Sequence, residues 1–412
     1  MTADPPRFGV NYTPRTGWFH SWQDLDLAEV HRDFTALAGL GLDHVRIFGL
    51  WPLLQPSRSL IRRSALDDVA SVVQVAADCG LQVAVDVLQG HMSSFDFVPA
   101  WLTSWHRRNL FTDPLAVAAE RELAAAIGAA VAEVGNVFAI TAGNETNQFA
   151  MPYHPDPQNC SPAEMGDWLD GMVAAPRPAL PEAWSLHSFD SAAWFDDRCP
   201  VIPAHATTIG EATTVHCWVF TGMTGVCEPG DPLLATLADY QVQLAIGAAA
   251  DADRPVWLQE IGAPQPWVPA DGAARFVADS LQPLLTSPQV FGVTWWCSHD
   301  VSRQLVDFPE LEHSLGLIDE RGEIKPAGRA IAELIASAQD IVRTPRGTAV
   351  VFPASDTSTG AGRAVTAPGG PVWRAWQELR AAGTSAALVS SDLADDQHEL
   401  AARGITDVIR PR

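Results

Sequence analysis

The chain has 412 residues, of which 47% are hydrophobic and 18% charged, so it can bury a large core and we exclude intrinsic disorder. Its formal net charge of -23 is spread along the sequence, which argues against nucleic acid as a partner. No segment reaches the roughly 18 consecutive apolar residues of a membrane span, and residues 1–9 lack the pattern of an export signal, so we expect a cytoplasmic protein that binds no membrane.

Short apolar segments alternate with amphipathic helical patterns over residues 1–340. The eight predicted strands cover residues 8–12, 44–48, 82–87, 137–141, 184–187, 213–218, 255–260 and 291–296. This alternation predicts a parallel sheet, either a closed barrel or a doubly wound open sheet. No GxGxxG or P-loop glycine pattern follows an early strand, which argues against the open sheet. We therefore predict a (β/α)8 TIM barrel, whose fifth strand, in a Pro-rich region, is the hardest to place.

A second unit is predicted after the barrel. Residues 343–347 form a charged, Pro-containing joint, and we place the domain boundary between residues 340 and 341. Beyond it, the predicted strands cover 348–352, 386–390 and 405–409, and the predicted helices cover 372–382 and 395–403. The pattern predicts a small C-terminal α/β (βαβαβ) accessory domain over residues 341–412.

Two glutamates follow predicted strands at positions where barrel enzymes carry their functional groups, namely the carboxyl ends of the strands. Glu145 comes after the fourth strand in Ala142-Gly143-Asn144-Glu145, and Glu260 ends the seventh. Glycoside hydrolysis needs such a pair, one carboxyl group to protonate the leaving oxygen and one carboxylate to attack the anomeric carbon. The alternative is that both are ordinary loop acids, but the pairing and the adjacent Asn144 argue against it.

This framework resembles the clan A glycoside hydrolases, and more specifically glycoside hydrolase family 5. The residues that match the family pattern are Arg46, Asn144, Glu145, His216, Glu260, and Trp295 or Trp296. The resemblance implies a retaining reaction in which Glu260 is the nucleophile and Glu145 the general acid/base, with Asn144 holding the sugar 2-hydroxyl. One of the two tryptophans is expected to form the floor of the sugar site, while the other packs outward.

Two of the candidate substrate-binding residues depart from the family pattern. His91 is displaced from the position expected after the third strand, and Trp218 stands where the family has Tyr. Loss of the Tyr hydroxyl removes a donor to the nucleophile, so we expect Arg46 and His216 to favour the ionised form of Glu260. His299 and Asp300 are candidate ligands of sugar hydroxyls, with a hydrogen-bonded loop pair as the alternative.

Longer segments, at residues 95–101, 105–109, 295–300 and 314–319, resemble the subgroup of family 5 that contains intracellular exo-β-mannosidases. The likeness spans residues 7–336. It implies release of mannose from short β-mannosides, such as β-1,4-linked manno-oligosaccharides or mannosyl-N-acetylglucosamine. An endo-β-mannanase or β-glucosidase of the same clan, or a non-catalytic sugar-binding barrel, is the alternative. The C-terminal unit loosely resembles the flavodoxin-like accessory domains of some barrel glycosidases.

A metal-dependent hydrolase is a further alternative, because His91, His216 and His299 could gather near carboxylates. However, the sequence contains no closely spaced ligand pair such as HxH or HExxH, so we predict no metal and no cofactor. The six cysteines lack CxxC spacing, and we assign them no disulfide. A small oligosaccharide is the expected partner. A homo-oligomer is compatible with the sequence, which carries no signal for one.

Overall fold

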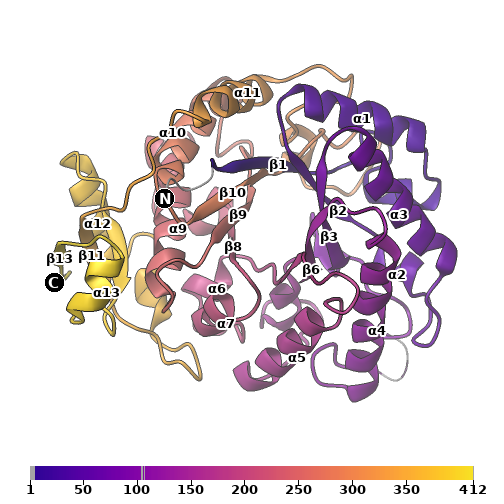
Figure 1. Cartoon of the computed structure of the whole chain (residues 1–412), viewed down its shortest axis with the longest axis horizontal. Coiled ribbons are helices and arrows are strands. Elements are labelled where there is room, and N and C mark those ends of the chain that lie inside the picture. Colours follow the sequence, from indigo (N-terminus) through magenta and orange to yellow (C-terminus); the bar gives the residue numbers. More distant parts are fainter. Residues whose placement is uncertain (1–4, 104, 106, 412) are drawn as a thin grey trace.

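The computed structural model describes residues 5–103, 105 and 107–411 and contains a ring of eight parallel strands. The strands are β1 (Arg7–Asn11), β2 (His44–Phe48), β3 (Gln82–Leu88), β6 (Val137–Gly143), β7 (Trp184–Leu186), β8 (Thr213–Cys217), β9 (Val256–Ile261) and β10 (Val290–Trp295). Each overlaps one predicted strand. The (β/α)8 TIM barrel is thus confirmed, and Figure 1 shows its helices outside the ring.

The ring has a seam between β7 and β8. The hydrogen-bonded order of the strands runs β7-β6-β3-β2-β1-β10-β9-β8, so these two strands lie at its ends. A side chain bridges the seam, because Thr214 Oγ1 of β8 donates a hydrogen bond of 3.1 Å to the carbonyl oxygen of His187, just after β7. The barrel is therefore nearly closed.

Some of the helices that cover the ring begin at side-chain caps. The carboxylate of Asp26 accepts hydrogen bonds from the first backbone N–H groups of α1, and Asp113 does the same for α4. The covering helices are α1 (Leu27–Gly39), α2 (Trp51–Leu54), α3 (Arg63–Asp78), α4 (Pro114–Val131), α5 (Pro162–Ala174), α6 (Ala192–Phe195), α7 (Pro203–Thr208), α8 (Val219–Gly222), α9 (Leu237–Ala248), α10 (Ala273–Leu285) and α11 (Pro326–Ala338). Within the described part of the chain, none of the helices combines the length and the apolar character that crossing a membrane requires.

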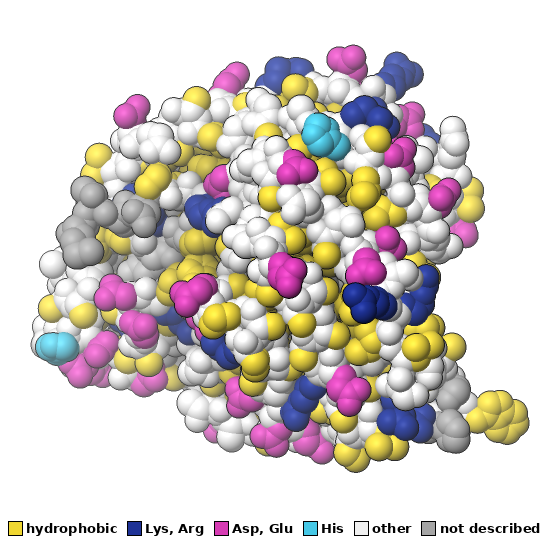
Figure 2. Space-filling view, turned by 45° about the vertical axis from the view of Figure 1, so that its right-hand side comes forward, with side chains coloured by type: hydrophobic (Ala, Val, Ile, Leu, Met, Phe, Trp, Pro, Cys, Tyr) yellow, Lys and Arg dark blue, Asp and Glu magenta, His cyan; other side chains and the backbone are white. Residues whose placement is uncertain are grey.

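Short elements in the loops complete the barrel. They are the hairpin of β4 (His91–Met92) and β5 (Phe95–Asp96) and the 3-10 helices η1 (Trp18–Gln23), η2 (Thr146–Ala150), η3 (Pro232–Thr236), η4 (Ala270–Gly272) and η5 (Glu310–Ser314). On the face of the molecule that Figure 2 shows, Asp and Glu side chains are scattered among Lys and Arg.

Aromatic side chains from the first residues of several strands fill the N-terminal end of the barrel. The ring centroid of Trp257 lies 5.5 Å from that of Phe138 and 5.9 Å from that of Phe291. Trp257 is fully buried, and its indole N–H donates a hydrogen bond of 2.8 Å to Thr294. The guanidinium of Arg7 lies 4.5 Å from the centroid of Phe138, a cation–π contact. This end of the barrel is a packed core.

The C-terminal residues form a second, smaller sheet with parallel strands in the order β12-β11-β13. Its elements are β11 (Thr348–Phe352), η6 (Arg363–Thr366), α12 (Pro371–Ala381), β12 (Ala387–Ser390), α13 (Gln397–Ala402) and β13 (Asp407–Ile409). The predicted small α/β unit beside the barrel is thus confirmed, whereas its boundary between residues 340 and 341 stays a prediction.

The C-terminal unit packs against α9 on one side of the barrel, where Figure 1 shows it in yellow. A Cβ atom at Gly247 of α9 would lie 2.3 Å from the carbonyl oxygen of Leu388 in β12, so the close approach of helix and strand requires glycine there. Arg346 Nη2 lies 2.6 Å from Asp239 Oδ1 of α9, and both side chains are buried. Packing and an ion pair therefore join the two units.

Candidate active site

A cavity of about 170 Å³ opens at the carboxyl ends of the barrel strands. Its walls come from β4 and β9 and from the segments that follow β6, β7, β8 and β10. The predicted site residues that line it are His91, Asn144, Glu145, Trp218, Glu260 and Trp296. Arg46 and His216, both fully buried, contact the two glutamates. The structure thus brings eight of the predicted residues together at one end of the barrel.

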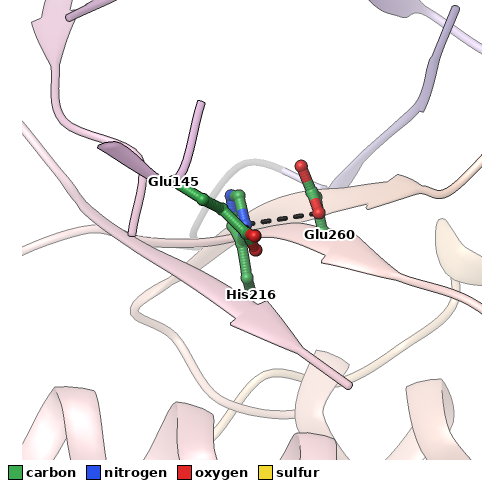
Figure 3. Close-up of side chains that lie close together, drawn as sticks. All are labelled: Glu145, His216 and Glu260. Carbon is green, nitrogen blue, oxygen red and sulfur yellow. Dashed lines mark hydrogen bonds and ion pairs between the residues drawn. The ribbon is translucent and has the colours of Figure 1, made fainter. Parts of the chain in front are cut away.

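The side chains of Glu145, His216 and Glu260 point toward one another, as Figure 3 shows. One oxygen of each carboxylate and one nitrogen of the imidazole all lie within 4.8 Å of one another. His216 Nδ1 is 2.7 Å from Glu145 Oε1 and 3.3 Å from Glu260 Oε2. The two carboxyl groups therefore share one imidazole and face the same cavity.

Arg46 connects the two sides of this centre. Its Nη1 donates a hydrogen bond of 2.8 Å to Glu260 Oε1, and its Nη2 donates one of 2.8 Å to Asn144 Oδ1. Asp86 accepts from Nε at 3.1 Å and from Nη2, so a buried carboxylate balances the buried guanidinium. Ser188 Oγ accepts a further bond of 2.8 Å. Since all of these groups are buried, the arrangement holds Arg46 in one orientation.

Trp218 donates a hydrogen bond from its indole N–H to Glu260 Oε2, with a length of 3.3 Å. The expectation that Trp in place of Tyr leaves the nucleophile without this donor is therefore wrong, because the indole nitrogen takes the place of the phenol oxygen. Glu260 thus accepts hydrogen bonds from both Arg46 and Trp218. These donors favour its ionised form.

Glu145 occupies an unusual backbone conformation, with φ of 43° and ψ of 38°, in the left-handed region that favours glycine. Its backbone N–H donates a hydrogen bond of 3.1 Å to the carbonyl oxygen of Ser188. The neighbouring Asn144 donates from Nδ2 to the carbonyl oxygen of His91 at 2.9 Å. Contacts on both sides therefore hold the turn that places the Glu145 carboxyl group in the cavity.

Burial raises the pKa of Glu145, and the positive charges of His91 and Arg46 oppose this shift only in part. Burial also raises the pKa of Glu260, where His216 and Arg46 act against it and the charge of Glu145 adds to it. Burial lowers the pKa of His216, which favours the neutral imidazole. Because Arg46 bonds directly to Glu260, that carboxyl group is the better stabilised anion of the pair, and Glu145 is the better site for the proton.

His91 faces the cavity from β4, and Asp96 orients its ring. Its Nδ1 lies 2.9 Å from Asp96 Oδ1, and the second oxygen of Asp96 lies 3.1 Å from His154 Nε2. Burial lowers the pKa of His91, but the hydrogen bond to Asp96 and the charge of Glu145 outweigh it, so the net shift is upward. The displaced histidine thus still lies beside the predicted acid/base.

Trp295, His299 and Asp300 are predicted site residues that the structure places away from the cavity. Trp295 is buried in the core, with its indole N–H directed at the carbonyl oxygen of Leu315. His299 is buried beside Ser298 and Asp33, and Asp300 Oδ1 binds Lys325 Nζ at 2.7 Å. Because packing or structural bonds occupy these groups, Trp296 is the tryptophan that lines the cavity, and we withdraw the other three as sugar ligands.

Some residues of the cavity wall were not predicted from the sequence. Glu312 is buried in η5, accepts the indole N–H of Trp296 at 3.4 Å, and has a pKa that burial raises to about 7. Asp190, after β7, has a pKa that burial raises to about 6. Asp190 lies in an irregular loop and Glu312 in a short 3-10 helix, and at neither place does a period in the sequence indicate which acid faces inward. His106, in the predicted 105–109 motif, lies outside the described residues.

Glu145, His216 and Glu260 also form a set that could hold a metal ion, since each offers one ligand atom. Arg46 is a poor neighbour for a divalent cation, because its guanidinium is 2.8 Å from Glu260 and is held there by Asp86. The arrangement therefore suits a pair of catalytic carboxyl groups better than it suits a metal ion.

Solved structures of GH5_18 resemble the chain over almost its whole length. GH5_18 from Streptomyces cattleya, a Glu→Ala variant in complex with Manβ1-4GlcNAc, is 48% identical, with a TM-score of 0.96 and coverage of 98% of this chain and 99% of that one. A corresponding complex of GH5_18 from Bifidobacterium longum subsp. longum is 38% identical, with a TM-score of 0.94 and coverage of 98% and 96%.

A more distant structure, the exo-β-1,4-mannosidase Op5Man5 from Opitutaceae bacterium strain TAV5, is 22% identical and shares the fold, with a TM-score of 0.77 over 95% of this chain and 70% of that one. No protein-family profile and no curated protein matches the chain. The identity to GH5_18 structures nevertheless confirms the resemblance to family 5 that the strand-end residues indicated. The chain therefore belongs to the GH5_18 group of glycoside hydrolase family 5.

Proposed function

We propose that the protein is a retaining exo-β-mannosidase that releases mannose from short β-mannosides. The observation that carries the retaining mechanism is the separation of at most 4.8 Å between one oxygen of Glu145 and one of Glu260. Carboxyl groups of retaining enzymes lie about 5–5.5 Å apart, whereas inverting enzymes need roughly 6.5–9.5 Å to admit a water molecule. The separation here supports direct attack by one carboxylate.

Glu260 is the proposed nucleophile, because Arg46 and Trp218 donate to its two oxygens and favour the charged form. Glu145 is the proposed general acid, since burial favours its protonated form. Glu260 attacks the anomeric carbon while Glu145 protonates the leaving oxygen. Glu145 then deprotonates the water that releases the sugar from Glu260.

Positioning falls to the residues around this pair. Arg46 holds the side-chain oxygen of Asn144, and the carbonyl oxygen of His91 accepts one of its two N–H groups, which leaves the other for the sugar 2-hydroxyl. Trp296 is the proposed floor of the sugar site because its side chain lines the cavity beside Trp218.

Two observations support small β-mannosides as the substrate class. The related GH5_18 structures hold Manβ1-4GlcNAc, and the cavity of about 170 Å³ is smaller than the roughly 300 Å³ at which pockets for larger ligands begin. Pro309, Leu311 and Glu312, on the segment after β10, form one wall of the cavity. Closure on that side favours removal of one terminal sugar over cleavage within a polymer.

Hydrolysis of matched aryl β-mannoside, β-glucoside and β-galactoside tests this proposal. We expect the wild type to cleave the mannoside with initial release of β-mannose, Glu260→Ala to be inactive, and mannohexaose to release mannose alone. Glu310→Ala is the control for Glu260→Ala. It removes the same kind of side chain, but Glu310 is 77% exposed and pairs with Arg303, so we expect wild-type activity. Initial release of α-mannose would refute retention. Initial release of mannobiose or mannotriose from mannohexaose, instead of mannose, would refute exo action.

A metal-dependent hydrolase is the second candidate, because three possible ligand atoms lie together. The assay above is therefore repeated with EDTA. We expect full activity in the chelator, since Arg46 already neutralises Glu260. Loss of activity that a divalent cation restores would favour the metal-dependent reaction.

We further propose a cytoplasmic location, a domain boundary between residues 340 and 341, and compatibility with a homo-oligomer. These proposals rest on the sequence alone. Limited proteolysis that cuts first within residues 339–347, followed by light scattering of the intact chain, tests the boundary and the oligomeric state.

A further inference from the structure

A segment of the C-terminal unit is inserted into a barrel loop beside the active site. Arg363, at the start of η6, is 2% exposed although it belongs to a surface loop. Its guanidinium donates hydrogen bonds to four backbone carbonyl groups of the barrel. These belong to Ala193 (3.2 Å), Asp196 (2.9 Å), Val201 (2.5 Å) and Cys199. One side chain of the small unit thus organises the segment at residues 193–201.

The guanidinium supplies hydrogen-bond donors that the segment lacks. The carbonyl groups at the end of the short helix α6 have no partner within the helix, and the irregular residues after it have none in a sheet. Arginine suits the position because its five N–H groups form a rigid planar fork. The contact is two-sided, since the Asp197 carboxylate accepts hydrogen bonds of 3.2 Å from the backbone N–H groups of Gly362 and Ala364.

Asp190 extends this segment to residues 190–201, because its carbonyl oxygen accepts a hydrogen bond of 3.4 Å from the Ala193 N–H. The extended segment holds the turn that carries Glu145. Asn147 Nδ2 and Gln148 Nε2, both in η2, each donate a hydrogen bond of 2.5 Å to the Asp190 carboxylate. Asn147 Nδ2 also lies 3.7 Å from the sulfur of Cys199, whose carbonyl oxygen accepts from Arg363. The backbone N–H of Gln148 bonds back to the carbonyl oxygen of Glu145 at 2.9 Å.

Glu145 needs external support because its backbone lies in the left-handed region, which a residue with a side chain adopts only when its surroundings impose it. Direct support comes from Gln148 in η2 and from Ser188. Asp190 and Cys199 act one step further away, because they contact Asn147 of η2. The contacts therefore run without a break from Arg363 to the proposed acid/base.

We propose that Arg363 is a positioning residue for catalysis: the C-terminal unit, through this side chain, holds the 190–201 segment and thereby the orientation of Glu145. The inference rests on the proposed function and assigns the small unit a role in the reaction.

The test compares leaving groups through kcat/KM, which reports formation of the glycosyl-enzyme. In that step a misplaced general acid slows only substrates whose leaving group needs a proton. 2,4-Dinitrophenyl β-mannoside departs without a proton, whereas Manβ1-4GlcNAc requires one. For Arg363→Met we expect kcat/KM to fall about tenfold or more on the disaccharide, since a displacement of about 1 Å can cost up to roughly 100-fold. On the dinitrophenyl substrate we expect a change of less than about threefold. Equal losses on both substrates would overturn the proposal.

Arg403→Met is the matched control. Arg403 is also a buried arginine of the C-terminal unit, and it donates to the carbonyl groups of Ile246, Ala249 and Ala250 at the end of α9, away from the cavity. The substrate ratio, meaning kcat/KM on Manβ1-4GlcNAc divided by kcat/KM on the dinitrophenyl substrate, should equal that of the wild type in Arg403→Met. A change in this ratio as large as that in Arg363→Met would show that any loss of docking suffices, which would also overturn the proposal.

Two milder variants keep the test valid if Arg363→Met does not fold. Arg363→Lys retains the charge but cannot reach four carbonyl groups, and Asp197→Ala removes a side chain that is 42% exposed. Both should shift the substrate ratio in the same direction by a smaller factor, and unchanged ratios would refute the inference.

Hydrogen exchange separates this inference from the proposed function. Amides of residues 145–151 should exchange faster in Arg363→Met than in the wild type, and at the wild-type rate in Arg403→Met. A wild type inactive on every β-mannoside would refute the proposed function alone. An active wild type whose 145–151 amides are equally protected in Arg363→Met would refute the positioning role alone.

Discussion

The two ends of the barrel use the same eight strands for opposite purposes. At the N-terminal end, Phe138, Trp257 and Phe291 pack into an apolar plug. At the carboxyl end, Arg46 and Glu260 form a buried ion pair beside the cavity. Burial at the first end excludes water and stabilises the fold. At the second end, burial raises the pKa of both catalytic candidates, so it prepares chemistry at the expense of stability.

We therefore expect that stability and catalysis can be changed separately in this protein. Substitutions at the carboxyl end should change rates or pH profiles with small effects on unfolding, and substitutions at the plug should do the reverse.

The largest effect is expected from Glu260→Gln, which keeps the shape of the side chain but removes the proposed nucleophile. We expect kcat to fall about 10⁴-fold or more, with an unfolding midpoint equal to or above that of the wild type. Steady-state kinetics and calorimetry of the same preparation measure both quantities. More than about one hundredth of the wild-type rate would remove Glu260 from its role.

Glu145→Gln should lower kcat/KM on substrates with poor leaving groups about 10³-fold. The acid must be protonated to act, so wild-type activity is lost as pH rises through the pKa of Glu145. Because burial raises this pKa, the alkaline limb lies above the value of about 4.3 for an ordinary glutamate. The alkaline limb of the pH profile of kcat/KM should disappear in Glu145→Gln. If the variant keeps this limb, the limb reports the titration of another group.

Trp257→Ala alters the apolar plug at the N-terminal end of the barrel. Removal of a fully buried indole should lower the free energy of unfolding by about 3–5 kcal/mol. Well below its unfolding temperature, the variant should keep kcat/KM within about twofold. Urea unfolding and kinetics at 25 °C provide the two numbers, and a parallel loss of activity would mean that the two ends are coupled.

The smallest effect is expected from Trp218→Phe, which removes the indole donor to Glu260. Glu260 must be ionised to attack, so activity is lost as pH falls through its pKa. Without the donor this pKa rises, and the acid limb should move to higher pH by roughly half a unit. Trp218→Tyr supplies a hydroxyl in its place and should shift the limb less, and an identical shift in both variants would discount the hydrogen bond.

The barrel and its carboxylate pair could be predicted from the sequence because both depend on local patterns. Apolar runs separated by helical patterns placed all eight strands. Glu145 lies just beyond the carboxyl end of one of them, and Glu260 lies near the carboxyl end of another. The family resemblance added Arg46 and His216, which the structure places against the same pair. These residues lie on or beside regular strands, whose register decides where a side chain points.

The residues of the long loops could not be placed in this way. Asp190 and Glu312 line the cavity, and residues of other segments contact their side chains. Asn147 and Gln148 donate to Asp190, and Trp296 donates to Glu312. His299 and Asp300 lie just after β10, but partners contributed by other segments, Asp33 and Lys325, draw them away from the cavity. Such contacts depend on tertiary structure, which no period or spacing in the sequence reports.

The left-handed backbone of Glu145 has a consequence for any attempt to make the enzyme more robust. Glycine adopts a φ of 43° freely, whereas a residue with a side chain is strained there by about 1–3 kcal/mol. Glu145→Gly should therefore yield a barrel that resists heat better but, without the acid/base, hydrolyses natural β-mannosides about 10³-fold more slowly or worse. A selection for thermal tolerance alone would enrich such impaired variants, so turnover must be selected together with stability.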